Sequence, residues 1–109
     1  MEVQAMNVDR MKPGADPKDL WNMTNDFLKK KGYAPNLRLY AHGQGLPLVE
    51  RPLIRYNETW KIKAGMNITV HPRAVTKTAW ATVCENWVIG KDSAGPCLHQ
   101  SPQKIIVIE

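Results

Sequence analysis

The sequence predicts an α+β fold in which one main helix packs on an antiparallel β-sheet. The first observation behind this prediction is a single amphipathic helical pattern between residues 17 and 31. The second is a series of short β-rich segments, separated by glycine and proline, that fills much of the remaining chain. The third is size, because 109 residues of which 43% are hydrophobic suit one domain with a modest core.

The helix is predicted to run from about Pro17 to Lys31. Asp16 is a good N-cap residue, and proline fits the first helical position, where its missing N–H is not needed. Apolar residues recur at helical spacing within "LWNMTNDFL", and Gly32 is a typical stop signal. Residues 1–15 show no such period, so we expect a flexible N-terminal arm there and a folded domain over residues 16–109.

The β-rich segments are read from their alternation and from the breakers between them. Strands are predicted at "LRLYA" (37–41), "MNITVHP" (66–72) and "KIIVIE" (104–109), and either one bent strand or a tight pair at 78–90. Residues 43–65 are predicted to be a loop and residues 92–96 a turn. One helix followed by several strands is the pattern that defines the α+β class here.

Composition narrows the classes of function. The net charge is +5, but the only basic run is Lys29-Lys30-Lys31 and no nucleic-acid-binding signature is present, so we disfavour a nucleic-acid binder. Cys84 and Cys97 match no zinc spacing and no secretory signal is apparent, which favours a reduced pair in a cytoplasmic protein. No apolar run is long enough to span a bilayer, so no membrane partner is expected.

Three histidines and one carboxylate are the candidates for chemistry: His42, His71, His99 and Glu85. All except His99 lie in or at the end of a predicted strand, an arrangement that allows them to converge on one face of a sheet. Imidazole and carboxylate together suit a divalent ion such as zinc, manganese, cobalt or iron. The competing interpretation, a histidine packed and hydrogen-bonded through its polar edge, stays open, and His99 is expected at the surface or in a turn.

Beyond spacing, the order of several sequence pieces resembles the C-terminal half of the pita-bread metallopeptidase superfamily. This group includes methionine aminopeptidase, Xaa-Pro aminopeptidase, prolidase and creatinase. After the helix, the pieces are "AHGQGL…VERP", "IKAGMNITVHP", "CENWVIG" and "LHQSPQKII". The resemblance covers about residues 17–109 and implies half of a pita-bread fold.

The resemblance implies a metal site. In active members two metals are held by two aspartates, one histidine and two glutamates, and metal-bound hydroxide attacks the peptide carbonyl. His42, opening "HGQG", matches the family's metal-binding histidine, and Glu85, in "CENW", matches the last glutamate. His71 stands where the family has its other glutamate, and Val49 replaces a second histidine that contacts substrate. The two aspartates belong to an N-terminal half that this sequence does not contain.

These departures lead us to expect a metallopeptidase relative that is inactive as this chain alone. The metal ligands implied are His42, His71 and Glu85, holding one divalent ion (manganese, cobalt, zinc or iron) or none, with His71 also open to being a core histidine. No catalytic or substrate-binding residue is assigned. The alternative function is a non-catalytic module that binds a peptide or small amide. For partners we expect a second copy of the chain or the missing N-terminal half, because half a pita-bread fold exposes apolar surface.

Overall fold

The computed structural model of the chain describes residues 1–108. Two helices are followed by seven strands. In chain order these are α1 (Glu2–Arg10), α2 (Pro17–Lys30), β1 (Ala41–Gly43), β2 (Glu50–Leu53), β3 (Asn67–Val70), β4 (Arg73–Val75), β5 (Trp80–Thr82), β6 (Glu85–Ile89) and β7 (Ala94–Cys97). No helix in the described part of the chain is long and apolar enough to cross a membrane.

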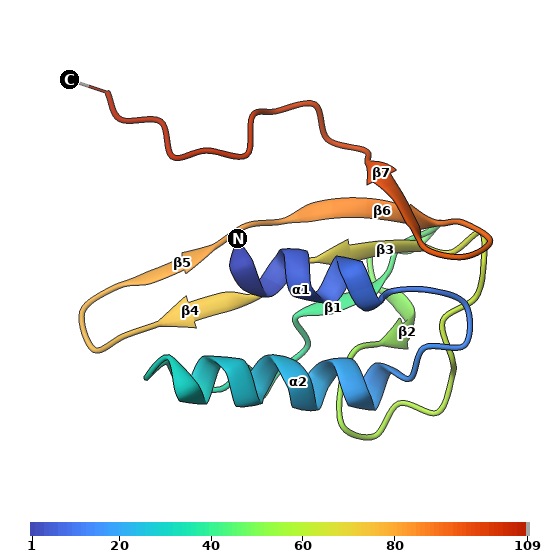
Figure 1. The fold of residues 1–109 in the computed structure, drawn as a ribbon, viewed down its shortest axis with the longest axis horizontal. Coiled ribbons are helices and arrows are strands. Elements are labelled where there is room, and N and C mark those ends of the chain that lie inside the picture. Colours follow the sequence, from blue (N-terminus) through green and yellow to red (C-terminus); the bar gives the residue numbers. More distant parts are fainter. Residues whose placement is uncertain (109) are drawn as a thin grey trace.

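The strands form two antiparallel sheets (Figure 1). The larger is five-stranded in the order β2-β1-β3-β6-β7, and the smaller pairs β4 with β5. All pairings are antiparallel, as the sequence predicted. Both outer strands of the larger sheet contain a proline, Pro52 in β2 and Pro96 in β7. An edge strand tolerates proline, because its free side needs no N–H to bond to a neighbouring strand.

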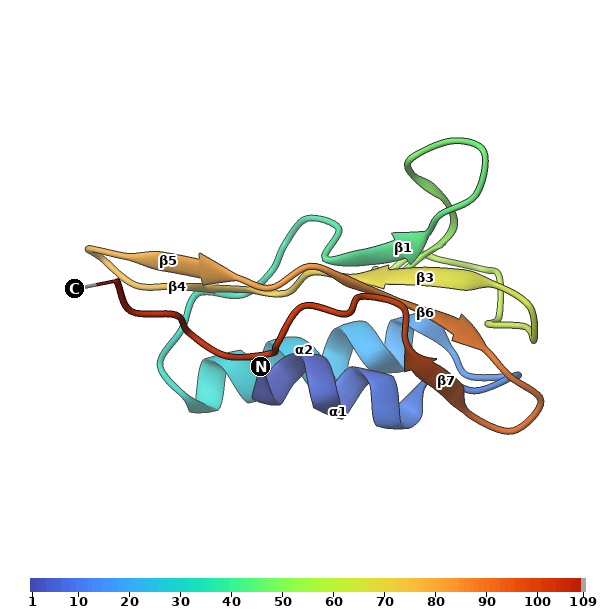
Figure 2. The ribbon, with the colours of Figure 1, turned by 90° about the horizontal axis from the view of Figure 1, so that it is seen from above.

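Both helices cover one face of the larger sheet, and the loop between β1 and β2 projects from the other (Figure 2). Buried apolar side chains fill the layer between helices and sheet, including Leu20 of α2, Ile68 and Val70 of β3, and Trp87 of β6. Residues of the sheet that alternate with these point away from the helices. The site described below lies on that second face.

Helix α2 confirms the predicted helix almost to the residue. The Asp16 side chain accepts a hydrogen bond from the Lys18 N–H at 3.0 Å, and Pro17 opens the helix. Leu20, Thr24 and Leu28, spaced by four residues, are buried against the sheet. Capping and spacing are local signals, which is why the sequence alone located this element.

The arm expected at residues 1–15 is instead largely helical, because α1 packs beside α2. Its buried residues are Val3, Gln4 and Asn7, so the buried stripe is mostly polar and gives no hydrophobic period. Asn7 Nδ2 donates to Thr24 Oγ1 at 2.7 Å, which ties the two helices together. The amide side chains are satisfied by hydrogen bonds rather than excluded from the core.

Tyr40 links the helices to the strand that carries the candidate histidine. Its hydroxyl accepts a hydrogen bond from Thr24 Oγ1 at 2.9 Å. It also lies 2.8 Å from Asn7 Oδ1 and 2.9 Å from the Leu20 carbonyl, either of which accepts its proton. The side chain is 1% exposed, and burial raises the pKa of this phenol.

Several strands lie at other positions than predicted, and one predicted strand is not formed. Strand β1 begins at residue 41 rather than 37, and β2 lies inside the predicted loop. The segment 78–90 contains two strands that belong to different sheets, and β7 starts inside the predicted turn at 92–96. Residues 104–108 form no strand, so the prediction of a terminal strand is wrong for the part described. Strand pairing is a non-local choice that alternation within one segment does not determine.

Candidate functional site

A row of polar residues crosses the face of the sheet that points away from the helices. His42 of β1 is opposite Thr69 of β3, and Thr69 is opposite Asn86 of β6. Directly opposed residues in antiparallel strands point to the same face, so these three side chains lie side by side. Each is 9% exposed or less. The row therefore forms a polar, partly enclosed floor.

His42 and His71 are in contact on this floor. The centroids of their imidazole rings are 5.1 Å apart, and the ring planes meet at 63°, edge to face. His71 follows β3 directly, and its backbone N–H donates to the Tyr40 carbonyl at 2.7 Å, which holds the end of β3 against the chain entering β1. The sheet thus brings together two of the three predicted metal ligands.

The backbone orients the His42 ring. Nδ1 lies 2.9 Å from the Gly43 carbonyl oxygen, a distance at which Nδ1–H donates to that oxygen. This tautomer leaves Nε2 with a free lone pair for a ligand. His71 is half-buried, and burial lowers its pKa, with the neighbouring His42 and Arg73 acting in the same direction. The lowered pKa favours the neutral form of His71, which is the form of imidazole that binds metals.

Glu85, the third predicted ligand, does not join the two histidines. It is opposite Val70, a core residue on the helix side of β3, and alternation along β6 therefore turns it away from Asn86. Its Oε2 accepts a hydrogen bond from Gln103 Nε2. Among residues 1–108, no three His, Cys, Asp or Glu side chains are grouped so as to hold a metal ion.

Sequence reasoning missed a cluster of amide side chains next to His42. Asn86 Nδ2 lies 2.9 Å from Gln44 Oε1, 2.7 Å from Thr69 Oγ1 and 3.2 Å from Asn67 Oδ1. His99, expected at the surface, is exposed and places Nε2 3.2 Å from Asn86 Oδ1. The alternation of Asn67, Thr69 and His71 in "NITVH" is the sequence signal from which one polar face could have been predicted.

The glycines after His42 permit a close approach of β2. A Cβ on Gly43 would lie 2.6 Å from the Arg51 carbonyl oxygen, and one on Gly45 would lie against the Glu50 carboxylate. Neither position tolerates a side chain without displacing its neighbour. Val49, where the resemblance leads us to expect a family histidine, is 47% exposed in the same loop.

An ion pair between the exposed Arg51 and the buried Glu58 fixes the far end of this loop. Arg51 Nε donates to Glu58 Oε1 at 3.0 Å, and Glu58 also accepts the backbone N–H groups of Leu53, Thr59 and Trp60. The Arg51 guanidinium in addition stacks 4.8 Å from the Trp60 ring centroid. Burial opposes ionisation, yet these hydrogen bonds bring the pKa of Glu58 down to about 2.

Chemically, the described residues offer two imidazole ligands and no carboxylate beside them. Such a pair suits part of the shell of one borderline divalent ion, since imidazole binds zinc, copper, iron and nickel well. It does not suit a pair of hard divalent ions, whose charge needs anionic oxygen ligands. A complete dinuclear centre would need ligands from outside the described residues.

An antiparallel sheet covered by helices on one face, with a histidine–glycine loop on the other, is typical of one half of a metallopeptidase. The chain belongs to this class, because the model of metallopeptidase family M24 matches residues 1–96. The chain is 24% identical over 108 residues to an uncharacterized peptidase, YqhT, of Bacillus subtilis. The matched region covers 98% of this chain and 31% of the relative. The chain is 36% identical over 74 residues to the Xaa-Pro dipeptidase of Pyrococcus furiosus, covering 66% of this chain and 21% of the relative.

Solved structures confirm the half pita-bread fold. The prolidase from Pyrococcus furiosus superposes with a TM-score of 0.82 at 27% identity, over 94% of this chain and 31% of that one. An X-Pro aminopeptidase from Thermotoga maritima gives a TM-score of 0.85 at 24% identity, over 98% and 31%. The chain therefore spans about a third of the length of these relatives, and matches them over nearly its own full length.

Proposed function

We propose that this chain carries the histidine-bearing half of an Xaa-Pro-peptidase-like site and does not hydrolyse peptides by itself. The observation that carries the proposal is the contact between His42 and His71 on the face away from the helices, with no third ligand of the His, Cys, Asp or Glu types grouped with them in residues 1–108. Membership of a metallopeptidase family supports a hydrolytic ancestry.

The site is best explained as a donor of ligands to a larger assembly. His42, His71 and, after a change in its orientation, Glu85 are the residues we assign as ligands. Relatives roughly three times as long have room for the missing carboxylates elsewhere in their chains. When bound there, a divalent metal would supply Lewis acidity, while this chain's share is to hold His42 Nε2 in the ligating tautomer through Gly43.

A direct assay tests the inactivity. The purified chain is incubated with a short peptide such as Ala-Pro and with manganese, cobalt, zinc or iron(II) in turn. We expect no hydrolysis above the buffer blank. Hydrolysis that disappears in a His42→Ala variant would contradict the proposal, and the variant excludes a contaminating peptidase as its source.

One observation favours a second function, a module that binds a peptide or small amide without cleaving it. Gln44, Asn67 and Asn86 present amide groups beside Thr69 on the same face, and amides pair well with amide ligands. Binding of Ala-Pro that survives in His42→Ala, with no turnover, would favour this module. Binding that requires both the metal and His42 would favour the peptidase-like site.

Location and assembly follow as part of the same proposal. Cys84 and Cys97 are unpaired thiols, which suits the reducing cytoplasm. Apolar side chains in the loop after β1 are strongly exposed, with Leu46 at 103% and Leu48 at 74%. We assign this surface to a contact with a second copy or with a complementary half, because isolated monomers rarely leave such residues uncovered together.

A further inference from the structure

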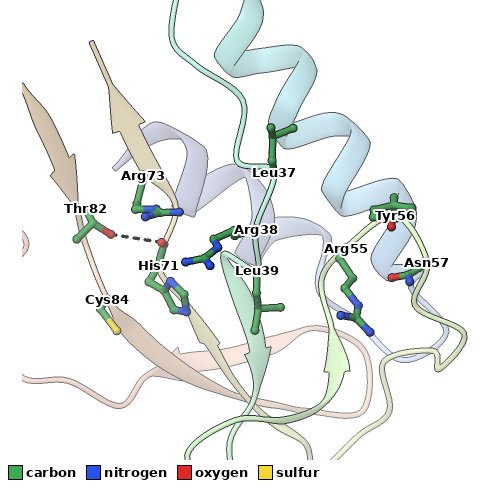
Figure 3. Close-up of a pocket in the computed structure, with 10 residues that line it drawn as sticks. All are labelled: Leu37, Arg38, Leu39, Arg55, Tyr56, Asn57, His71, Arg73, Thr82 and Cys84. Atoms are coloured by element: carbon green, nitrogen blue, oxygen red, sulfur yellow. Dashed lines mark hydrogen bonds between the residues drawn. The ribbon is translucent and has the colours of Figure 1, made fainter. Parts of the chain in front are cut away.

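An open cleft lies beside His71, on the side away from the amide cluster. Its volume is about 760 Å³, within the usual range for sites that take small molecules. Three of its ten lining residues are arginines, Arg38, Arg55 and Arg73, and none of the ten is acidic. Figure 3 shows Arg38 and Arg73 near His71, with Arg55 on the other side of Leu39.

The arginines have no ionic partner within the described residues. Three ion pairs occur there, and they join Lys31 to Glu2, Arg51 to Glu58 and Lys61 to Asp16. An unpaired guanidinium presents a fork of N–H donors that matches the oxygens of a carboxylate or phosphate. Arg38, Arg55 and Arg73 therefore give the cleft a positive charge that nothing else in its wall offsets.

The rest of the wall is mixed, with Leu37, Leu39 and Tyr56 as its large apolar side chains beside Asn57, His71, Thr82 and Cys84. Leu37 and Leu39 precede β1, and Tyr56 lies opposite them across Arg55 (Figure 3). Tyr56 is held in place by Trp21 of α2, with ring centroids 5.8 Å apart and the rings edge to face. A ligand here meets two cationic donors, Arg38 and Arg73, at the end near His71, and apolar side chains with one further cation, Arg55, at the other end. Apolar surface with a few placed polar groups is the usual composition of a small-molecule site.

We propose that this cleft binds a small organic oxyanion, a carboxylate or a phosphate ester with an apolar body. Arg38 and Arg73 hold the anionic head, and Leu37, Leu39 and Tyr56 contact the apolar part. The proposal goes beyond the function proposed above, because it requires neither a metal nor His42. It assigns a role to side chains that the metallopeptidase-like site does not use.

The test is an NMR titration of the full chain in EDTA, which removes metals and so separates this proposal from the metal site. N-acetyl-leucine and phenyl phosphate are the anionic probes, and N-acetyl-leucinamide is the neutral match. We expect saturable shifts of the backbone amides of residues 37–39, 55–57, 71 and 73 with at least one anion, and none with the amide. The anion that binds identifies the head group as carboxylate or phosphate.

Charge-matched variants complete the test. Arg38→Gln and Arg73→Gln are each expected to weaken binding about tenfold, the usual effect of removing a charge-assisted hydrogen bond. Arg10→Gln removes the same charge from the exposed end of α1 and should leave binding within about twofold. Equal weakening in all three variants, equal binding of the neutral amide, or no binding of either anion would overturn the proposal. Because all three arginines are exposed, circular dichroism should show each variant folded.

Discussion

The imidazole rings of His42 and His71 lie edge to face, with centroids 5.1 Å apart, at the junction of β1 and the end of β3. Neither residue is near the other in sequence, so the contact exists because β1 and β3 pair in a fixed register. The resemblance of "GMNITVHP" to the family's motif leads us to expect a glutamate at the position of His71 in active members. On that expectation, we propose that this contact is the point at which the chain departs from the peptidase pattern while keeping the two positions together.

The amide cluster should stabilise the fold as well as shape the site. Asn86→Ala leaves Gln44 and Thr69 without a shared partner in a half-enclosed place, and should lower the free energy of unfolding by about 1–3 kcal/mol. Urea denaturation measures the change. Asn22→Ala, at an exposed position of α2, is the control and should stay within about 0.5 kcal/mol. Equal effects of the two substitutions would show that the amide cluster contributes nothing to the free energy of unfolding.

The Tyr40 hydroxyl should matter for a similar reason. Tyr40→Phe keeps the ring but leaves Thr24 Oγ1 and Asn7 Oδ1 short of a partner, at a cost of about 1–2 kcal/mol in the free energy of unfolding. Tyr56→Phe, on an exposed tyrosine, serves as the control. Thermal or urea unfolding compares the two. A Tyr40→Phe variant as stable as the parent would contradict the assignment of this hydroxyl as the link between α1, α2 and β1.

Acid should destabilise the chain through Glu58. Its pKa is about 2 in the folded state against an ordinary value of 4.5. Between these two pH values the folded protein therefore binds fewer protons than the unfolded protein. The stabilisation is therefore complete above about pH 4.5 and is lost as the pH falls toward 2. Urea midpoints measured across this window should fall less steeply in Glu58→Gln than in the parent chain.

An exposed carboxylate gives the control for that measurement. Asp26→Asn, on the solvent side of α2, should leave the slope of stability against pH close to that of the parent. Glu58→Gln should also be less stable at pH 7, because Arg51 loses its ionised partner and the buried backbone N–H groups lose a charged acceptor. A parallel pH dependence in parent and Glu58→Gln would remove Glu58 as the cause.

The C-terminal segment should promote self-association. Ile105 is 87% exposed and Val107 is 79% exposed in an extended stretch that pairs with no strand in the described chain. Light scattering at micromolar concentration should give a mass above that of one 12.4 kDa chain, and replacing both residues by lysine should lower it. A mass of one chain for the parent would contradict the expectation of a homo-oligomer.

How far the sequence predicted the fold depended on whether each signal was local. Helix α2 was predicted almost to the residue because Asp16 caps it and its apolar residues repeat at helical spacing. Helix α1 was not, because Gln4 and Asn7 are buried through hydrogen bonds and leave no apolar stripe. Strand β1 was misplaced and β2 was missed inside a predicted loop, because the bounds of both strands follow from pairing with other strands.

The same distinction applies to the site. His42 and His71 were predicted from their positions at strand ends, and the resemblance to a metallopeptidase family added the role. Glu85 failed to join them because neighbouring residues of a strand point to opposite faces, so a single position decides which face is reached. Asn86, one residue later, is the side chain that lies in the row of His42. Only the observed pairing register determines which of these two neighbouring residues lies on the face of His42.

We propose that this chain supplies two histidine ligands and not a complete metal centre. Isothermal titration of the chain and of His42→Ala with zinc, manganese and cobalt measures this. We expect at most one ion per chain, with binding lost in His42→Ala. Binding should be retained in His99→Ala, because His99 lies beside Asn86 and not beside His71. Two ions bound per chain, or one ion bound equally well by His42→Ala, would contradict it.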